Sequence, residues 1–125
     1  MKLKKFFLIF ASSVLLIIAM IYGVSPSWFV TNFLDLPEAT TDFSHLLRAI
    51  MCLYLAFAGF WFYSAFHDKH RDTALLSAVV FGGGLLIGRI VSFVVDGQPS
   101  MLLMIYIGME VSLVPIAYWI YKRPD

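Results

Sequence analysis

The chain has 125 residues, of which 61% are hydrophobic and 14% charged, and its mean hydropathy is +0.86. A soluble domain of this size could not cover so much apolar surface, whereas lipid can solvate it. The net charge of +1 argues against a nucleic-acid partner. The single cysteine, Cys52, excludes an internal disulfide and a cysteine-based zinc site. We therefore expect one integral membrane domain, residues 1–125.

The first apolar run follows three lysines and extends over residues 6–24. It resembles a secretory signal peptide, but it is longer than a usual signal core. The small residues near its end are followed by Pro26, which is a poor place for cleavage. About 20 apolar residues are enough to cross the hydrocarbon. The run therefore predicts an uncleaved first transmembrane helix.

A linker with structure of its own follows over residues 25–42. Ser25 and Pro26 are typical of a helix start, as a cap followed by proline in the first turn. Trp28 and Phe29 make the segment amphiphilic, and Pro37 ends it. We expect a short helix in the membrane interface, with its aromatic rings at headgroup depth.

Three further spans are predicted over residues 43–66, 73–95 and 100–121. A short polar loop, residues 67–72, separates the second and third spans, and a tight turn over residues 96–99 separates the third and fourth. Short connections favour antiparallel neighbours. The fold class is therefore all-α, an antiparallel four-helix transmembrane bundle with a short interfacial helix between the first two spans.

The basic residues outside the spans all fall on one side of this topology. They lie before the first span, in the loop at 67–72 and after the fourth span, whereas the linker 25–42 and the turn 96–99 contain no lysine or arginine. Short loops rich in lysine and arginine stay in the cytoplasm. The pattern predicts a multi-pass protein with both termini cytoplasmic and the linker periplasmic.

Three charged residues, Arg48, Arg89 and Glu110, lie inside the predicted spans. Such charges are costly in lipid, so each should face the bundle and find a partner. At about 1.5 Å per residue, Arg48 and Arg89 lie about 9 and 10 Å below the periplasmic ends of their helices, and Glu110 about 15 Å below. These depths predict a polar cluster in the periplasmic half of the bundle.

Polar neighbours at helical spacing extend this cluster along one stripe of each helix. The predicted ligand-binding residues are His45, Arg48, Arg89, Ser92, Asp96, Tyr106 and Glu110. Two arginines against one glutamate leave an excess positive charge, which Asp96, helix carbonyls or an anionic ligand could balance. Gly84, Gly88 and Ser92 also form a small-residue stripe, which favours close helix packing over a hinge.

Scattered motifs between residues 46 and 121 resemble the DUF4345 family of small bacterial membrane proteins. They are Arg48-Ala49, Leu53-Tyr54-Leu55-Ala56, Gly88-Arg89 with Ser92 and Asp96-Gly97, and Glu110. The resemblance implies a bacterial inner-membrane location and supports the choice of these charged residues and Gly97. The family has no known function, so the resemblance implies no chemistry.

Three functions remain open on the sequence. The first is binding of a small anionic or lipid-like ligand, such as a lipid headgroup, at the periplasmic polar site. The second is a structural or partner-binding subunit, or a homo-oligomer, whose charges only lock helix packing. The third is a small enzyme acting on a lipid-soluble substrate, with Glu110 as general base.

No metal and no cofactor is predicted. The histidines and aspartates of the loop 67–72 are better explained as a solvated loop than as a metal site. His45 is the one histidine in or near a span, which disfavours a haem held by two histidines.

Overall fold

The computed structural model describes residues 2–123, which form five helices. Their bounds are α1 Lys2–Gly23, α2 Pro26–Phe33, α3 Thr41–Ala65, α4 Asp68–Asp96 and α5 Met101–Lys122. Four of them, all but the short α2, are long and apolar enough to cross a membrane. No strand occurs within the described residues. The predicted all-α four-span fold with a short helix after the first span is confirmed, and the chain is a multi-pass membrane protein.

The predicted polar loop over residues 67–72 is wrong in its extent. α4 begins at Asp68, so that Phe66 and His67 alone separate it from α3. Asp68 lies in the first turn of α4, where a negative charge complements the helix dipole, and it forms an ion pair with Arg71 one turn later. These local interactions let the polar segment continue the helix beyond the apolar span.

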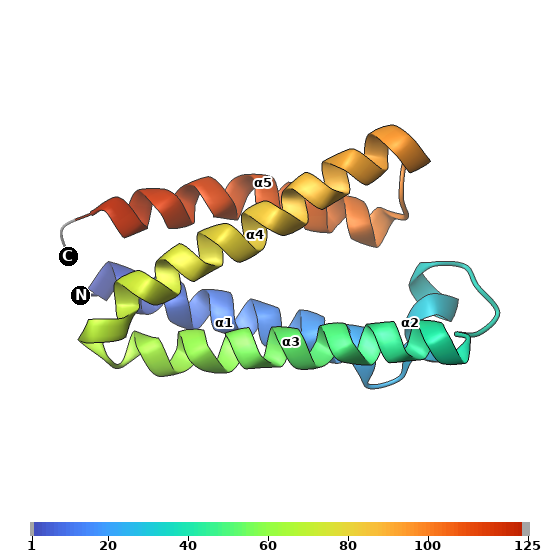
Figure 1. The fold of residues 1–125 in the computed structure, drawn as a ribbon, viewed down its shortest axis with the longest axis horizontal. Coiled ribbons are helices and arrows are strands. Elements are labelled where there is room, and N and C mark those ends of the chain that lie inside the picture. The colour runs from blue at the N-terminus through green and yellow to red at the C-terminus, as the bar shows by residue number, and fades with distance from the viewer. Residues whose placement is uncertain (1, 124–125) are drawn as a thin grey trace.

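The long helices are arranged as two pairs (Figure 1). α1 lies along α3, and α4 packs chiefly against α5. Both described ends of the chain and the α3–α4 turn lie at one end of the bundle, here called the terminal end. α2 and the α4–α5 turn lie at the opposite end, here called the linker end. The two pairs diverge toward the linker end, and the buried residues of α4 (Ala74, Leu75 and Ala78) all lie in its half nearer the terminal end.

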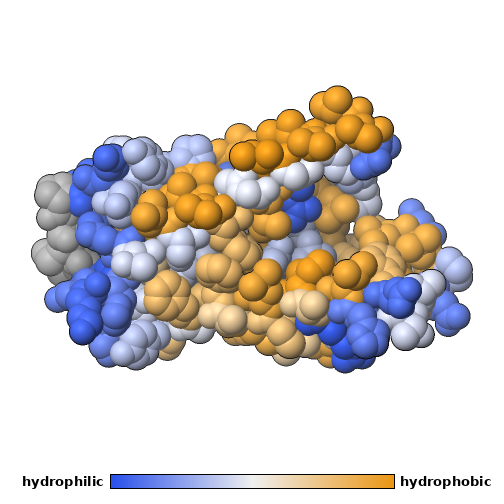
Figure 2. Space-filling model, in the orientation of Figure 1, coloured by the Kyte–Doolittle hydropathy of each residue, from blue (hydrophilic) through white to orange (hydrophobic). Residues whose placement is uncertain are grey.

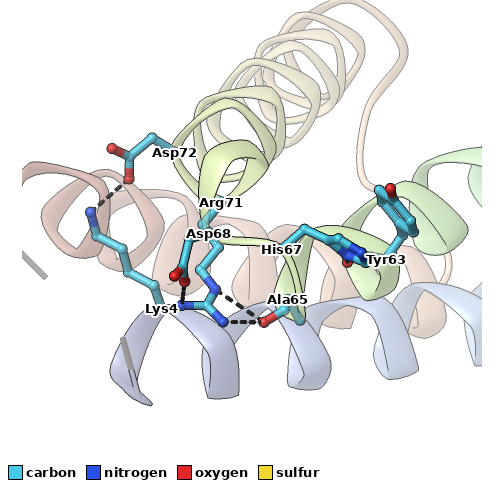
Figure 3. A network of polar contacts seen from close by, with 7 residues as sticks. All are labelled: Lys4, Tyr63, Ala65, His67, Asp68, Arg71 and Asp72. Carbon is cyan, nitrogen blue, oxygen red and sulfur yellow. Dashed lines mark hydrogen bonds and ion pairs between the residues drawn. The ribbon is translucent and has the colours of Figure 1, made fainter.

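An ionic network holds the terminal end together (Figure 3). Lys4 of α1 is 3% exposed, and its Nζ lies 2.6 Å from Oδ1 of Asp72 on α4. Arg71 donates from Nε and Nη2 to the carbonyl oxygen of Ala65, at 3.0 and 2.8 Å, and so satisfies an acceptor at the end of α3. The network therefore connects α1, α3 and α4 where the chain turns.

A chain of aromatic rings extends from α2 into the bundle. Ser25 caps α2 as predicted, and Phe29 on this helix is 1% exposed. The ring of Phe29 lies 4.9 Å from that of Tyr22 on α1, which lies 5.8 Å from Tyr54 on α3. Tyr54 in turn lies 5.1 Å from Phe81 on α4. α2 is thus packed onto the linker end of the bundle through edge-to-face aromatic contacts.

Close helix packing occurs at glycines other than those predicted. A Cβ atom added to Gly23 would lie 2.4 Å from Cβ of Met51, and one added to Gly82 would lie 2.7 Å from a methyl group of α5. At Gly84 and Gly88 an added Cβ would meet nothing within 4 Å. The prediction that Gly84 and Gly88 form a packing stripe is therefore wrong, because these two glycines face open space.

Candidate functional site

A cleft of about 390 Å³ opens where the two helix pairs diverge. Gly84, Gly88 and Ser92 of α4 form part of one wall, and Ile50 and Tyr54 of α3 form part of the other. In Figure 2 a hollow separates the two arms of the molecule at this end, with apolar surface on both arms. The absence of side chains on the two glycines of α4 keeps this space open.

Arg89 and Glu110, two of the three charges predicted to lie in one polar cluster, form an ion pair beside this cleft. Nε of Arg89 donates to Oε1 of Glu110 at 2.8 Å, and the two side chains are 17% and 15% exposed. Helical side chains lean toward the N-terminus of their own helix. α4 begins at the terminal end and α5 at the linker end, so Arg89 leans toward the middle of the bundle and Glu110 leans out to meet it.

Three tyrosines from three helices surround the ion pair. The ring of Tyr22 lies 5.8 Å from that of Tyr54 and 5.9 Å from that of Tyr106. The guanidinium carbon of Arg89 lies 5.4 Å from the centre of the Tyr106 ring, within the range of a cation–π contact. The buried hydroxyl of Tyr106 has no hydrogen-bond partner among the described residues. This hydroxyl can serve a ligand that carries an oxygen or nitrogen acceptor.

The guanidinium of Arg89 also retains hydrogen-bonding capacity. Within residues 2–123 it forms one hydrogen bond of good geometry, from Nε to Glu110, and the Tyr22 hydroxyl is a further polar neighbour. Most donors of a guanidinium are on its two terminal Nη groups. Arg89 can therefore donate to a second acceptor in the cleft without giving up Glu110.

A second hollow, here called the apolar groove, lies between α1 and α5 and has a volume of about 110 Å³. Val14 and Ile18 of α1 face Leu113 and Val114 of α5 across it. The groove and the cleft share three lining residues, Tyr54, Leu85 and Arg89. Arg89 thus lies where a largely apolar space meets a more polar one.

Ser92 and Asp96 continue the polar stripe of α4 beyond Arg89. The Ser92 hydroxyl donates to Oδ2 of Asp96 at 2.6 Å, and both side chains are exposed. Ser92 lines the cleft, as do Tyr22 and Arg89. Of the predicted residues, the structure brings together Arg89, Glu110, Tyr106 and Ser92, with Asp96 attached through Ser92.

Arg48 and His45 do not join this cluster. Both are exposed and line a separate hollow on α3 with Ser44 and Cys52. Leu47, the residue before Arg48, is buried in the bundle, and successive helical residues are about 100° apart. The predicted convergence of both arginines is therefore wrong. The expected excess of positive charge is absent from the cleft, because Glu110 compensates Arg89.

Tyr22 and Tyr54 were not predicted as part of the site. The available signal was a tyrosine within the first and within the second apolar span, since a buried tyrosine usually requires a partner for its hydroxyl. In the part of the chain described, no group of three or more His, Cys, Asp or Glu side chains is placed to hold an ion.

Fold and site together define a small multi-pass membrane protein with a polar cluster between its helix pairs. Residues 3–121 match the family model DUF4345, a domain of unknown function, so the chain belongs to this family. The match includes the first span and the linker, which the motif resemblance did not cover. No curated protein and no solved structure matches the chain.

Proposed function

We propose that this protein binds a lipid-soluble amphiphile whose polar head lies in the cleft beside Arg89 and whose chain lies in the apolar groove. One observation carries the proposal: Arg89 lines both hollows, so a single molecule could occupy both while touching the same guanidinium. Ligand sites of this kind are largely apolar, with a few convergent polar groups that fix orientation.

The donors at the junction favour a head group with oxygen acceptors. The Nη groups of Arg89 can donate to such oxygens in the cleft. Tyr106 lines the adjoining groove, and its hydroxyl, which has no hydrogen-bond partner within residues 2–123, is a further donor there. Glu110 already compensates the charge of Arg89, so a second negative charge would be repelled by Glu110 in a low-dielectric site. A neutral carbonyl or hydroxyl head is therefore favoured over an anionic head.

The distribution of lysine and arginine along the chain indicates which leaflet of the membrane holds the proposed site. With both termini in the cytoplasm, the linker end and its cleft face the outer leaflet of the membrane. In a bacterial inner membrane this leaflet is the periplasmic one. The ligand would then enter sideways from the outer leaflet, between α3 and α4, where the glycines of α4 leave the cleft open.

A purely structural role, in which the ion pair only holds the helices together, explains its position less well than ligand binding does. Arg89 and Glu110 connect α4 with α5, which already pack against each other. The ion pair does not connect the two diverging helix pairs, which is where an interaction that stabilises the whole bundle would be needed. Catalysis by Glu110 is likewise less well supported, because its carboxylate is engaged by Arg89.

The substitution Gly88→Leu tests the proposal by filling the cleft. The probe is a monoacylglycerol with a photoreactive group in its chain, added to the purified protein in detergent. An added side chain at Gly88 meets nothing within 4 Å, so the variant should fold while losing roughly tenfold in labelling of α1 and α5. The matched control is Gly83→Leu on the same helix. A Cβ added to Gly83 also meets nothing within 4 Å, but Gly83 lines neither the cleft nor the apolar groove.

Equal labelling of the two variants would contradict the proposed site. A fatty acid with the same photoreactive chain tests the charge of the head. Stronger labelling by the fatty acid than by the monoacylglycerol, lost in Gly88→Leu, would keep the site but overturn the preference for a neutral head.

A further inference from the structure

We infer that Arg48 and His45 form a second, independent site that binds the phosphate of a membrane phospholipid on the outward face of α3. This site is separate from the cleft at Arg89 in position and in charge. Its ligand is the phosphodiester of a lipid in the leaflet at the linker end.

Arg48 has no partner for its charge among the residues that the structure describes. Within residues 2–123 it forms neither an ion pair nor a side-chain hydrogen bond, and it is exposed on the face of α3 turned away from Leu47 and Tyr54. A hollow of about 520 Å³ lies beside it. His45, Ser44 and Thr41 line the hollow nearer the start of α3 and offer polar groups, whereas Ala49 and Cys52 are small.

The direction of α3 carries this guanidinium to phosphate depth. The 25 residues of α3 extend about 37 Å, which exceeds the roughly 30 Å of hydrocarbon, so the helix is long enough for its first turn to reach the headgroups. Arg48 lies about 10 Å along the helix from Thr41. Its side chain leans toward the helix N-terminus, past His45, and can extend along the apolar surface until its charged end reaches the headgroups.

The chemistry at this depth favours a phosphate. An arginine without a partner facing lipid is costly, and the phosphate oxygens of phospholipids are the anionic acceptors that every such leaflet provides at headgroup level. The planar guanidinium donates to two phosphate oxygens at once, and the neighbouring hydroxyls and imidazole can donate to the others. Because both acyl chains can lie against the outer face of α3, the lipid need not enter the bundle.

Native mass spectrometry of the whole protein tests this site. The probes are phosphatidylglycerol and a diacylglycerol with the same acyl chains, which lacks the phosphate. We expect the protein to retain phosphatidylglycerol in preference, and Arg48→Gln to weaken that retention about tenfold. Arg48→Lys should fall between them, because it keeps the charge but loses the two-pronged donor. The control is Lys69→Gln, which removes an exposed positive charge at the terminal end.

Two results would overturn the inference. The first is equal retention of phosphatidylglycerol by the wild-type protein and Arg48→Gln, with or without a change of oligomeric size, and the second is equal retention of the diacylglycerol and phosphatidylglycerol by the wild-type protein. Displacement of the lipid by millimolar inorganic phosphate would likewise assign the site to a free anion. Gly88→Leu should retain phosphatidylglycerol normally, so the outcome does not depend on the proposed function of the cleft.

Discussion

Arg48 and Arg89 lie at similar distances from the linker end but have opposite surroundings. Arg48 is on a helix that begins at this end, so its side chain leans out of the membrane, and it is exposed. Arg89 is on a helix that ends there, so its side chain leans inward to Glu110. The direction of the helix, as much as depth, decides which partner an intramembrane arginine can reach.

Removing Glu110 should destabilise the protein more than removing the whole ion pair. Glu110→Ala leaves the partly buried charge of Arg89 without its partner. Breaking a buried ion pair costs roughly 3–5 kcal/mol, and we expect the free energy of unfolding to fall by an amount near the lower end of this range. The double variant Arg89→Gln with Glu110→Gln should cost less than the sum of the two single changes. Unfolding in detergent compares the wild-type protein, Glu110→Ala, the single variants Arg89→Gln and Glu110→Gln, and the double variant. Additive costs of the two glutamine substitutions would contradict direct coupling.

Depth and helical spacing were enough to predict that Arg89 and Glu110 lie in one polar cluster, with Ser92 and Tyr106 on the same stripes of their helices. They could not exclude Arg48, because the sequence does not reveal which face of α3 is turned inward until Leu47 and Tyr54 are known to be buried. The tyrosines of the site depend on contacts among three helices, which spacing within one helix does not define.

At the scale of the helix, glycine spacing did not distinguish a packing face from the wall of a cleft. Gly84 and Gly88 have the spacing of a close-packed stripe, yet the close approaches are made by Gly23 and Gly82. Whether a small residue meets a neighbouring helix depends on where the helices diverge. That divergence is a property of the assembled bundle.

Substitution by alanine should separate these two kinds of glycine. Gly23→Ala places a methyl group against Met51, which must move, and should lower the free energy of unfolding by about 1–3 kcal/mol. Gly84→Ala meets open space and should leave stability unchanged or raise it by up to about 1 kcal/mol through helix propensity. Thermal unfolding in detergent compares them, and an equal loss in both variants would show that α4 packs where the structure leaves a cleft.

For the whole molecule, the four-span fold was predictable because long apolar runs have few alternatives to membrane-spanning helices. The short helix after the first span was predictable from its cap and proline, and the structure places Ser25 as that cap. The opening between the helix pairs was not predictable, because it depends on how far α4 tilts from α3. The early start of α4 also depends on interactions of Arg71 across the turn.

The orientation in the membrane can be tested with reporters active on one side only. A reporter fused after Arg123 should be active in the cytoplasm, and one inserted between α2 and α3 should be active on the opposite side, because lysine and arginine are concentrated at the terminal end. The opposite pair of readings would place the cleft and Arg48 in the cytoplasmic leaflet.

The ionic network at the terminal end also makes α4 a lever. Lys4, Asp72 and Arg71 hold this helix near its beginning, whereas its far end diverges from α3 and its buried residues all lie in the first half (Figure 1). From Asp72 to its end at Asp96, α4 extends about 36 Å, so a rotation of about 5° beside Asp72 would move the far end by roughly 3 Å. Small angular adjustments beside Asp72 are thereby magnified into changes of width at the mouth beside Ser92.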